Sequence, residues 1–207
     1  PRELIAFVAI SNRLIADSSP SAEKAVRSSL ARALATAETG AFIRGTGGVA
    51  PLGIVHMDGT HVMSPVAGSV LAADDLVDTL TYLRTQFSDA TGWLTTPAVF
   101  GIVRKLKDHE GRFIFSDPLG ADPGKLFGRP VLSTPLCASV DEPTTHYLIA
   151  TDWSNNVIIA DRQTLEISAS SHVKFMENLT VVRASKRHDI NASHPSAICV
   201  LPVTGVA

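Results

Sequence analysis

The sequence is short of charge and carries no surplus of either sign. Lys and Arg number 18 and Asp and Glu number 20 among 207 residues, so the formal net charge is −2 and charged residues make up 18%. Globular proteins usually carry about 25% charged residues. The near-neutral balance argues against a general nucleic-acid binder, which needs cations to neutralise phosphates. The scarcity of charge instead indicates a surface that is partly buried against other chains.

Cysteine is also scarce, and the two that are present, Cys137 and Cys199, have no C-x-x-C spacing. A chain of this length does not need disulfides, so a reduced, intracellular setting is expected. The longest stretch without charge, residues 190–207, contains two prolines and several polar residues. It therefore predicts strand and turn, and no membrane span. No initiator Met or basic leader precedes Pro1, which favours a fragment or a processed product over a secreted precursor.

Motifs for catalysis, nucleotide binding and metal binding are missing or incomplete. No serine lies in a G-x-S-x-G elbow, and neither cysteine has a neighbouring histidine in the sequence. Residues 120–126 differ from a phosphate loop, because three residues separate the glycines and Leu126 stands where a hydroxyl should bind Mg²⁺. His56 and His61, with Asp58 between them, lack a further clustered ligand. We therefore expect no cofactor, no metal site and no enzymatic activity.

Three amphipathic helices are predicted from capping residues and apolar spacing. The first covers residues 20–44, is capped by Ser19 and ends at a glycine-rich segment. The second covers residues 74–87, and the third covers residues 97–108 and is capped by Thr96. The expected inner face of the first helix consists of Val26, Leu30, Ala33, Leu34, Ala37 and Ala41.

Short apolar runs predict strands, mostly in the last third of the chain, so the fold class is α+β. Residues 4–10 are apolar throughout, which fits a strand covered on both faces. Turn residues such as Asp161-Arg162 are expected to separate the later strands. Those strands are expected at residues 112–115, 130–132, 147–150, 157–160, 165–167, 179–182 and 197–201.

Several segments, read in order along the chain, share a pattern with one known family. Residues 9–18 lead into the first helix and then into residues 41–54, as in the family's spine helix and its exit into an axial domain. Residues 106–115, Leu-Lys-Asp-His-Glu-Gly-Arg-Phe-Ile-Phe, precede Leu-Phe-Gly-Arg-Pro-Val at residues 126–131, which is close to a family signature. Residues 160–178 resemble the family's paired long strands. In this colinear order the chain resembles the phage major capsid proteins with the HK97 fold.

The resemblance implies an α+β capsid fold of two domains. A peripheral domain, with the long spine helix and long strands, would comprise residues 1–44 and 155–189. An axial domain, with a mixed sheet flanked by helices, would comprise residues 45–154 and 190–207. The implied function is that of a major capsid protein, which self-assembles into the icosahedral head shell of a tailed phage or prophage. An encapsulin-like nanocompartment shell is the alternative with the same fold, and a small α/β hydrolase is the alternative from another class.

The implied partners are copies of the same chain, arranged in hexamers and pentamers. Scaffold, protease and portal proteins of the phage would take part in assembly in the bacterial cytoplasm, and the product would be the virion. Contact with DNA would be independent of its sequence. Family members are longer, so Pro1 would lie in the returning strand of an extended hairpin. We expect that a fragment without that hairpin does not form closed shells.

Some members of the family join neighbouring subunits by an isopeptide bond between a hairpin lysine and an asparagine, with a glutamate as base. Asn178 matches the acceptor asparagine in this chain. Seven residues further on, Ser185 stands in place of the glutamate, and the lysine would lie upstream of Pro1. A lysine amine with an ordinary pKa of about 10.4 needs a base before it can attack. The resemblance therefore predicts no self-catalysed cross-link.

Overall fold

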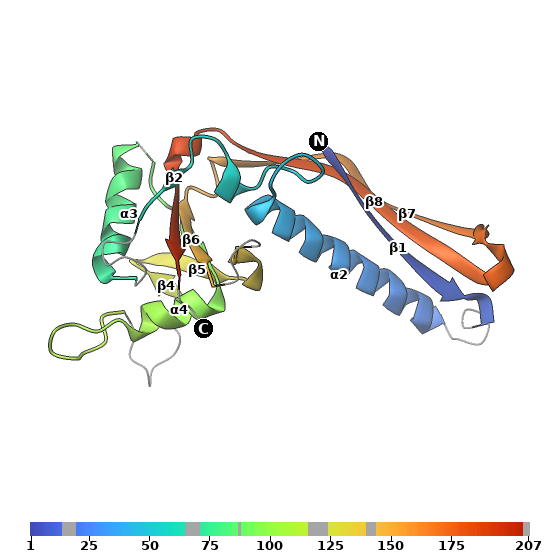
Figure 1. Cartoon of the computed structure of the whole chain (residues 1–207), viewed down its shortest axis with the longest axis horizontal. Coiled ribbons are helices and arrows are strands. Elements are labelled where there is room, and N and C mark those ends of the chain that lie inside the picture. Colours follow the sequence, from blue (N-terminus) through green and yellow to red (C-terminus); the bar gives the residue numbers. More distant parts are fainter. Residues whose placement is uncertain (14–19, 65–70, 87, 116–123, 140–143, 205–207) are drawn as a thin grey trace. The chain divides into compact units, whose positions relative to one another are not determined.

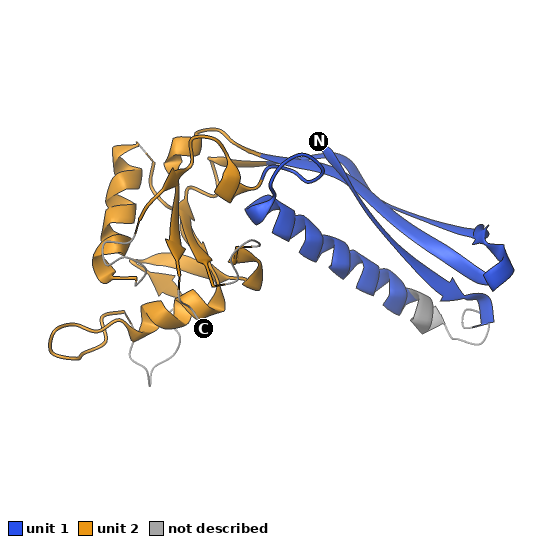
Figure 2. Cartoon of the chain, viewed as in Figure 1, with its two compact units in different colours: residues 1–52, 159–190 blue, residues 53–158, 191–207 orange. Residues whose placement is uncertain are grey.

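The computed structural model describes residues 1–13, 20–64, 71–86, 88–115, 124–139 and 144–204 (Figure 1). The chain forms two compact units, each built from two segments (Figure 2). Unit 1 comprises residues 1–52 and 159–190, and unit 2 comprises residues 53–158 and 191–207. The chain passes between the units after residues 52, 158 and 190, whereas the sequence-based domain limits lie after residues 44, 154 and 189.

Unit 1 is a three-stranded sheet with one long helix on one face. The strand order is β1-β8-β7, with β1 (Arg2–Ser11), β7 (Val157–Lys174), β8 (Leu179–Ala192) and the helix α2 (Pro20–Arg44). β1 runs antiparallel to β8, with Arg2 opposite His188 and Ser11 opposite Leu179. Leu30 and Leu34 of α2 pack with Ala184 of β8 and with Leu4, Ala6, Ile167 and Val182. The predicted strand at residues 4–10 and the predicted helix from residue 20 are both confirmed.

Two predictions about which faces are covered are wrong. β1 is covered on one face within the described residues, because Ile5 and Phe7 alternate with the packed residues and remain exposed. On α2, Ala33 and Ala37 are exposed, although the apolar spacing placed them on the inner face. The inner row instead continues from Leu34 to Glu38, a charged residue that an apolar pattern does not indicate. The predicted cap Ser19 lies outside the described residues.

A charged cluster connects the helix to the two longer strands of unit 1. Lys186 Nζ on β8 lies 2.6 Å from Glu38 Oε1 on α2 and 3.2 Å from Asp161 Oδ1 on β7. The hydrogen bond to Glu38 is the main reason why the pKa of Lys186 is raised. The turn predicted at Asp161-Arg162 is wrong, because β7 is one continuous strand from Val157 to Lys174. The neighbouring strand β8 stabilises the extended backbone of β7. Local turn propensity at Asp161 contains no information about this pairing.

Unit 2 contains a six-stranded mixed sheet in the order β2-β9-β6-β3-β5-β4. β2 pairs parallel with β9, β3 pairs parallel with β5, and the other neighbours are antiparallel. The helices α3 and α4 and short 3-10 turns connect these strands (Figure 1). The elements are β2 (His61–Val62), α3 (Ala73–Thr85), β3 (Gly92–Thr95), α4 (Pro97–Lys105), β4 (Lys125–Leu126), β5 (Arg129–Ser133), β6 (His146–Thr151) and β9 (Ile198–Val203).

The core of unit 2 lies between its two helices and one face of the sheet. Leu76 and Leu83 of α3 and Val99 and Val103 of α4 join Trp93 of β3 in one cluster, and all five are essentially inaccessible to solvent. The facing strands contribute Leu148, Ala150, Cys199, Leu201 and Val203. The predicted helices at residues 74–87 and 97–108 are thus confirmed in kind, although Phe87 lies outside the described residues.

The segment after α4 differs from the prediction. The helix begins as expected, with the Thr96 side chain accepting a hydrogen bond from Val99 N, but it ends at Lys105 and not at Asp108. The Asp108 carboxylate accepts hydrogen bonds from the backbone of Arg112 and Glu110 and from Arg112 Nε, which lowers the pKa of Asp108. These bonds close a turn, so the strand predicted at residues 112–115 is wrong. A single bridge pairs Lys107 with Phe113 instead.

Gly45 is expected to tolerate no side chain. It follows α2, and a Cβ placed on it would collide with the carbonyl oxygen of Pro51 and lie 2.5 Å from that of Ala41. We expect Gly45→Ala to lower the free energy of unfolding by about 2 kcal/mol, because the backbone must shift to make room. Gly101→Ala is the matched control, since a Cβ there meets nothing within 4 Å inside α4. That change should raise stability by about 0.5–1 kcal/mol, so urea unfolding curves that move in the same direction would contradict the prediction.

Candidate assembly surfaces

One face of the sheet in unit 1 presents apolar side chains to solvent. Ile5 and Phe7 of β1 are 47% and 76% exposed. The register places Phe7 opposite Arg183 and Ile5 opposite Ser185 on β8. β1 is also an edge strand, whose outer backbone groups are available to pair with another chain. This face and edge together are suited to contact with a second molecule.

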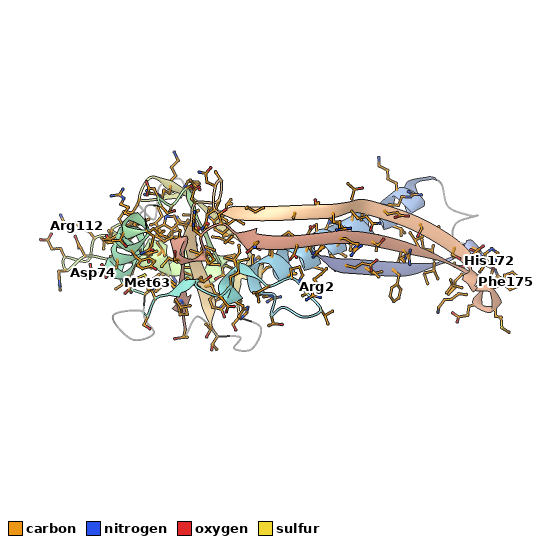
Figure 3. The ribbon with its side chains drawn as sticks, turned by 90° about the horizontal axis from the view of Figure 1, so that it is seen from above. Arg2, Met63, Asp74, Arg112, His172 and Phe175 are labelled. Carbon is orange, nitrogen blue, oxygen red and sulfur yellow. The ribbon has the colours of Figure 1, made fainter. Side chains whose placement is uncertain are left out.

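The hairpin that joins β7 to β8 ends in an exposed apolar tip. Val173, Phe175 and Met176 are 72%, 77% and 100% exposed. Figure 3 shows Phe175 at the end of the hairpin, beside His172. Burying side chains of this size contributes about 1.5–3 kcal/mol each. We define Val173, Phe175 and Met176 as the hairpin tip; its side chains gain most if another subunit covers them.

Asn178, the predicted match to a cross-link acceptor, lies beside this tip in the left-handed region, with φ 53°. Its Oδ1 accepts a hydrogen bond from Asn12 Nδ2 at 2.8 Å. Asn12 Oδ1 in turn accepts from the Thr180 hydroxyl at 2.6 Å, and Asn12 N donates to Asn178 O at 3.1 Å. Sequence reasoning missed Asn12, because nothing local indicates a partner 166 positions away.

Ser185, the other residue of that prediction, is not brought to Asn178 within one chain. It lies seven residues along β8, which corresponds to about 23 Å of extended strand. Its side chain is buried, with 5% exposure, opposite Ile5. Within one copy of the chain these two residues therefore form no common site.

Unit 2 also exposes apolar side chains, on the segment after α4 and in the turn between β4 and β5. Phe113, Ile114 and Phe127 are 37%, 45% and 40% exposed. The rings of Phe115 and Phe127 meet edge to face with centroids 5.1 Å apart. Lys107 Nζ lies 4.9 Å from the centroid of the Phe113 ring. We define Lys107, Phe113, Ile114, Lys125 and Phe127 as the aromatic patch.

The residues that could bind a metal ion or act as nucleophiles are far apart from one another. The His61 ring stacks on Tyr82, with centroids 3.7 Å apart, and His56 is exposed. Among the described residues no three His, Cys, Asp or Glu side chains gather as a metal site. Burial raises the pKa of both cysteine thiols to about 12, which disfavours the reactive thiolate. Most of the incomplete phosphate loop, residues 120–123, lies outside the described residues.

No helix within the described ranges has the length and apolar character needed to cross a membrane. A hollow along α2 is lined by Ser29, Arg32, Ala33, Thr36 and Ala37. This lining pairs no nucleophile with a base, so it does not support the hydrolase alternative.

Comparison with known proteins gives a consistent result. The model of the phage capsid family matches residues 1–203. The major capsid protein of Enterobacteria phage HK97 is 24% identical over 188 residues, which cover 90% of this chain and 48% of that protein. The chain therefore spans about half the length of this curated relative.

Two solved structures illustrate how far the likeness of fold extends. The capsid of an empty GTA particle superimposes with a TM-score of 0.82 and 27% identity, covering 99% of this chain and 74% of that one. An encapsulin complex from Synechococcus elongatus superimposes with a TM-score of 0.71 and 13% identity, covering 98% of this chain and 74% of that one. The second likeness concerns the fold alone.

Proposed function

This chain belongs to the phage capsid family and has the HK97 capsid fold, and on that premise we propose that it is a major capsid protein subunit. It self-assembles into the icosahedral head shell of a tailed phage or prophage. The observation that carries this proposal is the likeness to a capsid protein along the whole chain. The exposed hairpin tip and the open face of β1 support it, because both leave apolar groups for a neighbouring subunit to bury.

In this proposal unit 1 is the peripheral domain and unit 2 is the axial domain. Copies of the chain form hexamers and pentamers through contacts between unlike surfaces, and many weak contacts together stabilise the shell. The role is structural and not enzymatic. Scaffold, protease and portal proteins act with it in the bacterial cytoplasm, where the shell that becomes the virion capsid is assembled.

The proposed function is tested by expressing the protein as its gene encodes it and imaging the product by electron microscopy. Icosahedral particles are expected. A product that stays monomeric at high concentration, with or without partner phage proteins, would overturn the proposal.

The encapsulin likeness supports a second candidate, a compartment that stores a cargo enzyme. The contents of the purified particles separate the two functions. Packaged DNA and neighbouring genes for portal and terminase support the phage capsid. A co-purifying cargo protein, encoded by an adjacent ferritin-like or peroxidase gene, supports the nanocompartment.

We further propose that assembled particles contain no isopeptide cross-link at Asn178. The Ser185 hydroxyl is a poor base for removing a proton from a lysine ammonium, and its side chain is buried. Particles boiled in detergent should therefore run as a single monomer band on a denaturing gel. A ladder of covalent oligomers that disappears in Asn178→Asp would show that this expectation is wrong.

A further inference from the structure

The turn between β4 and β5 holds an aromatic residue in a backbone conformation that suits glycine or asparagine. Phe127 and Gly128 have φ values of 51° and 78°, and they connect the paired residues Leu126 and Arg129. Two-residue hairpin turns of this kind favour Asn-Gly, because the first position needs a positive φ. A non-glycine residue held there costs about 1 kcal/mol or more. Phe127 is nevertheless 40% exposed, so its ring gains only part of the burial that would offset this strain.

The aromatic patch contains two lysines, Lys107 over the Phe113 ring and Lys125 in β4. Lys107 and Lys125 are exposed, and neither takes part in an ion pair among the described residues. Arg112, close by in the sequence, is already neutralised by Asp108 and Glu110 at 3.0 and 2.8 Å. The positive charge of the two lysines is therefore available to groups outside this copy of the chain.

The outer face of α3 is negatively charged. Asp74 and Asp78 are exposed one turn apart, and Val77 between them is 46% exposed. Neither carboxylate takes part in an ion pair among the described residues. We define Asp74, Val77 and Asp78 as the acidic face. Figure 1 shows α3 along one side of unit 2 and α4 and β4 along another, and Figure 3 labels Asp74 of the acidic face.

We propose that the acidic face of one copy docks on the aromatic patch of the next copy. The occupant is a second copy of this chain, because the two surfaces complement each other in charge and each offers apolar groups at its centre. They are unlike surfaces of one unit, so the contact is head to tail, and in the hexamers and pentamers of the proposed function it closes into a ring. This inference rests on the proposed function and identifies which surfaces of unit 2 join neighbouring subunits.

The test reverses one charge on each surface in the protein as its gene encodes it. Asp78→Lys alone and Lys107→Glu alone should each reduce the yield of rings and shells at least about tenfold, since like charges then face each other. The double variant Asp78→Lys with Lys107→Glu restores opposite charges and should recover most of the yield. Asp58→Lys is the matched control, because it makes the same charge change at an exposed site outside the acidic face.

A second variant separates docking from folding. Phe127→Asn relieves the strain of the positive φ and loses the edge-to-face contact with Phe115, two effects of similar size that oppose each other, so the thermal unfolding midpoint should stay about unchanged. The yield of rings should still fall at least about tenfold, because the aromatic group at the centre of the contact is gone. Normal assembly of the Phe127→Asn variant would overturn the proposal.

The outcomes distinguish this inference from the function on which it rests. If the unaltered protein forms shells and the double charge reversal assembles no better than either single reversal, the proposed contact is wrong and the capsid function stands. Equal loss of assembly in Asp58→Lys would also overturn the contact. If the unaltered protein forms neither rings nor shells, both proposals fall together.

Discussion

Replacing Trp93 with alanine should remove about 3–5 kcal/mol from the stability of unit 2. Trp93 has no exposed surface and sits at the centre of the cluster between the helices and the sheet. Its indole Nε1 also donates a hydrogen bond to Leu126 O at 3.2 Å, which connects the core to the strand β4. Alanine would leave a large cavity and remove this hydrogen bond. Urea unfolding followed by circular dichroism measures the loss.

Trp153→Phe is the matched control for that experiment. Trp153 is half-buried, and its Nε1 donates to Gly92 O at 2.9 Å. Phenylalanine keeps most of the ring and loses one hydrogen bond, so a cost of only about 1 kcal/mol is expected. A Trp93→Ala protein whose stability matches this control would show that the core of unit 2 does not depend on Trp93.

The double change Phe175→Asp with Met176→Asp should abolish shell assembly and leave folding unaffected. Both side chains are at least three-quarters exposed, so their replacement disturbs little inside the subunit. In a shell, each substitution would remove about 1.5–3 kcal/mol of apolar burial energy at every contact. The two aspartates would also place two charges in the contact. Particle yield by sedimentation and the unfolding midpoint of the unassembled subunit measure the two effects.

Ser171→Asp provides the comparison, because it adds a charge at an exposed position of β7 near the hairpin tip. Assembly in this control should stay within about twofold of the unaltered protein, as expected for a surface change that removes no apolar side chain of the hairpin tip. If the tip variant also assembled normally, the hairpin tip would have no role in shell contacts.

The helices were predictable because their signals are local. Thr96 and Pro97 indicate the start of α4, and the structure confirms the cap. The inner row of α2 was not predictable, since its charged member Glu38 is matched by Lys186, 148 positions away. The continuity of β7 through Asp161 depends on pairing with β8, which follows later in the sequence. Local propensity therefore predicts where these elements lie in the sequence, but not which residues pack against them.

Single residues of the candidate surfaces could be predicted from the sequence, but their contacts could not. Asn178 was identified by its resemblance to a family position, but its hydrogen bond to Asn12 depends on pairing between strands that are far apart in the sequence. The exposure of Phe175 and Met176 was not predictable, because large apolar residues are buried in most folded proteins and nothing local marks these two as exposed. Both residues lie in a 3-10 turn, Phe175–Glu177, which joins the ends of β7 and β8 beyond the paired strands, and only the placement of these strands shows that the turn is exposed.

The pairing of β1 with β8 has a consequence for synthesis. Arg2 leaves the ribosome long before its partner His188, because most of the two units is translated between them. At about 5–20 residues per second, the interval is roughly ten to forty seconds. During that time the apolar strand β1 lacks the neighbour with which it pairs in the folded subunit. Nascent subunits should therefore engage chaperones cotranslationally at this strand, and a slowed ribosome should increase their loss to aggregation.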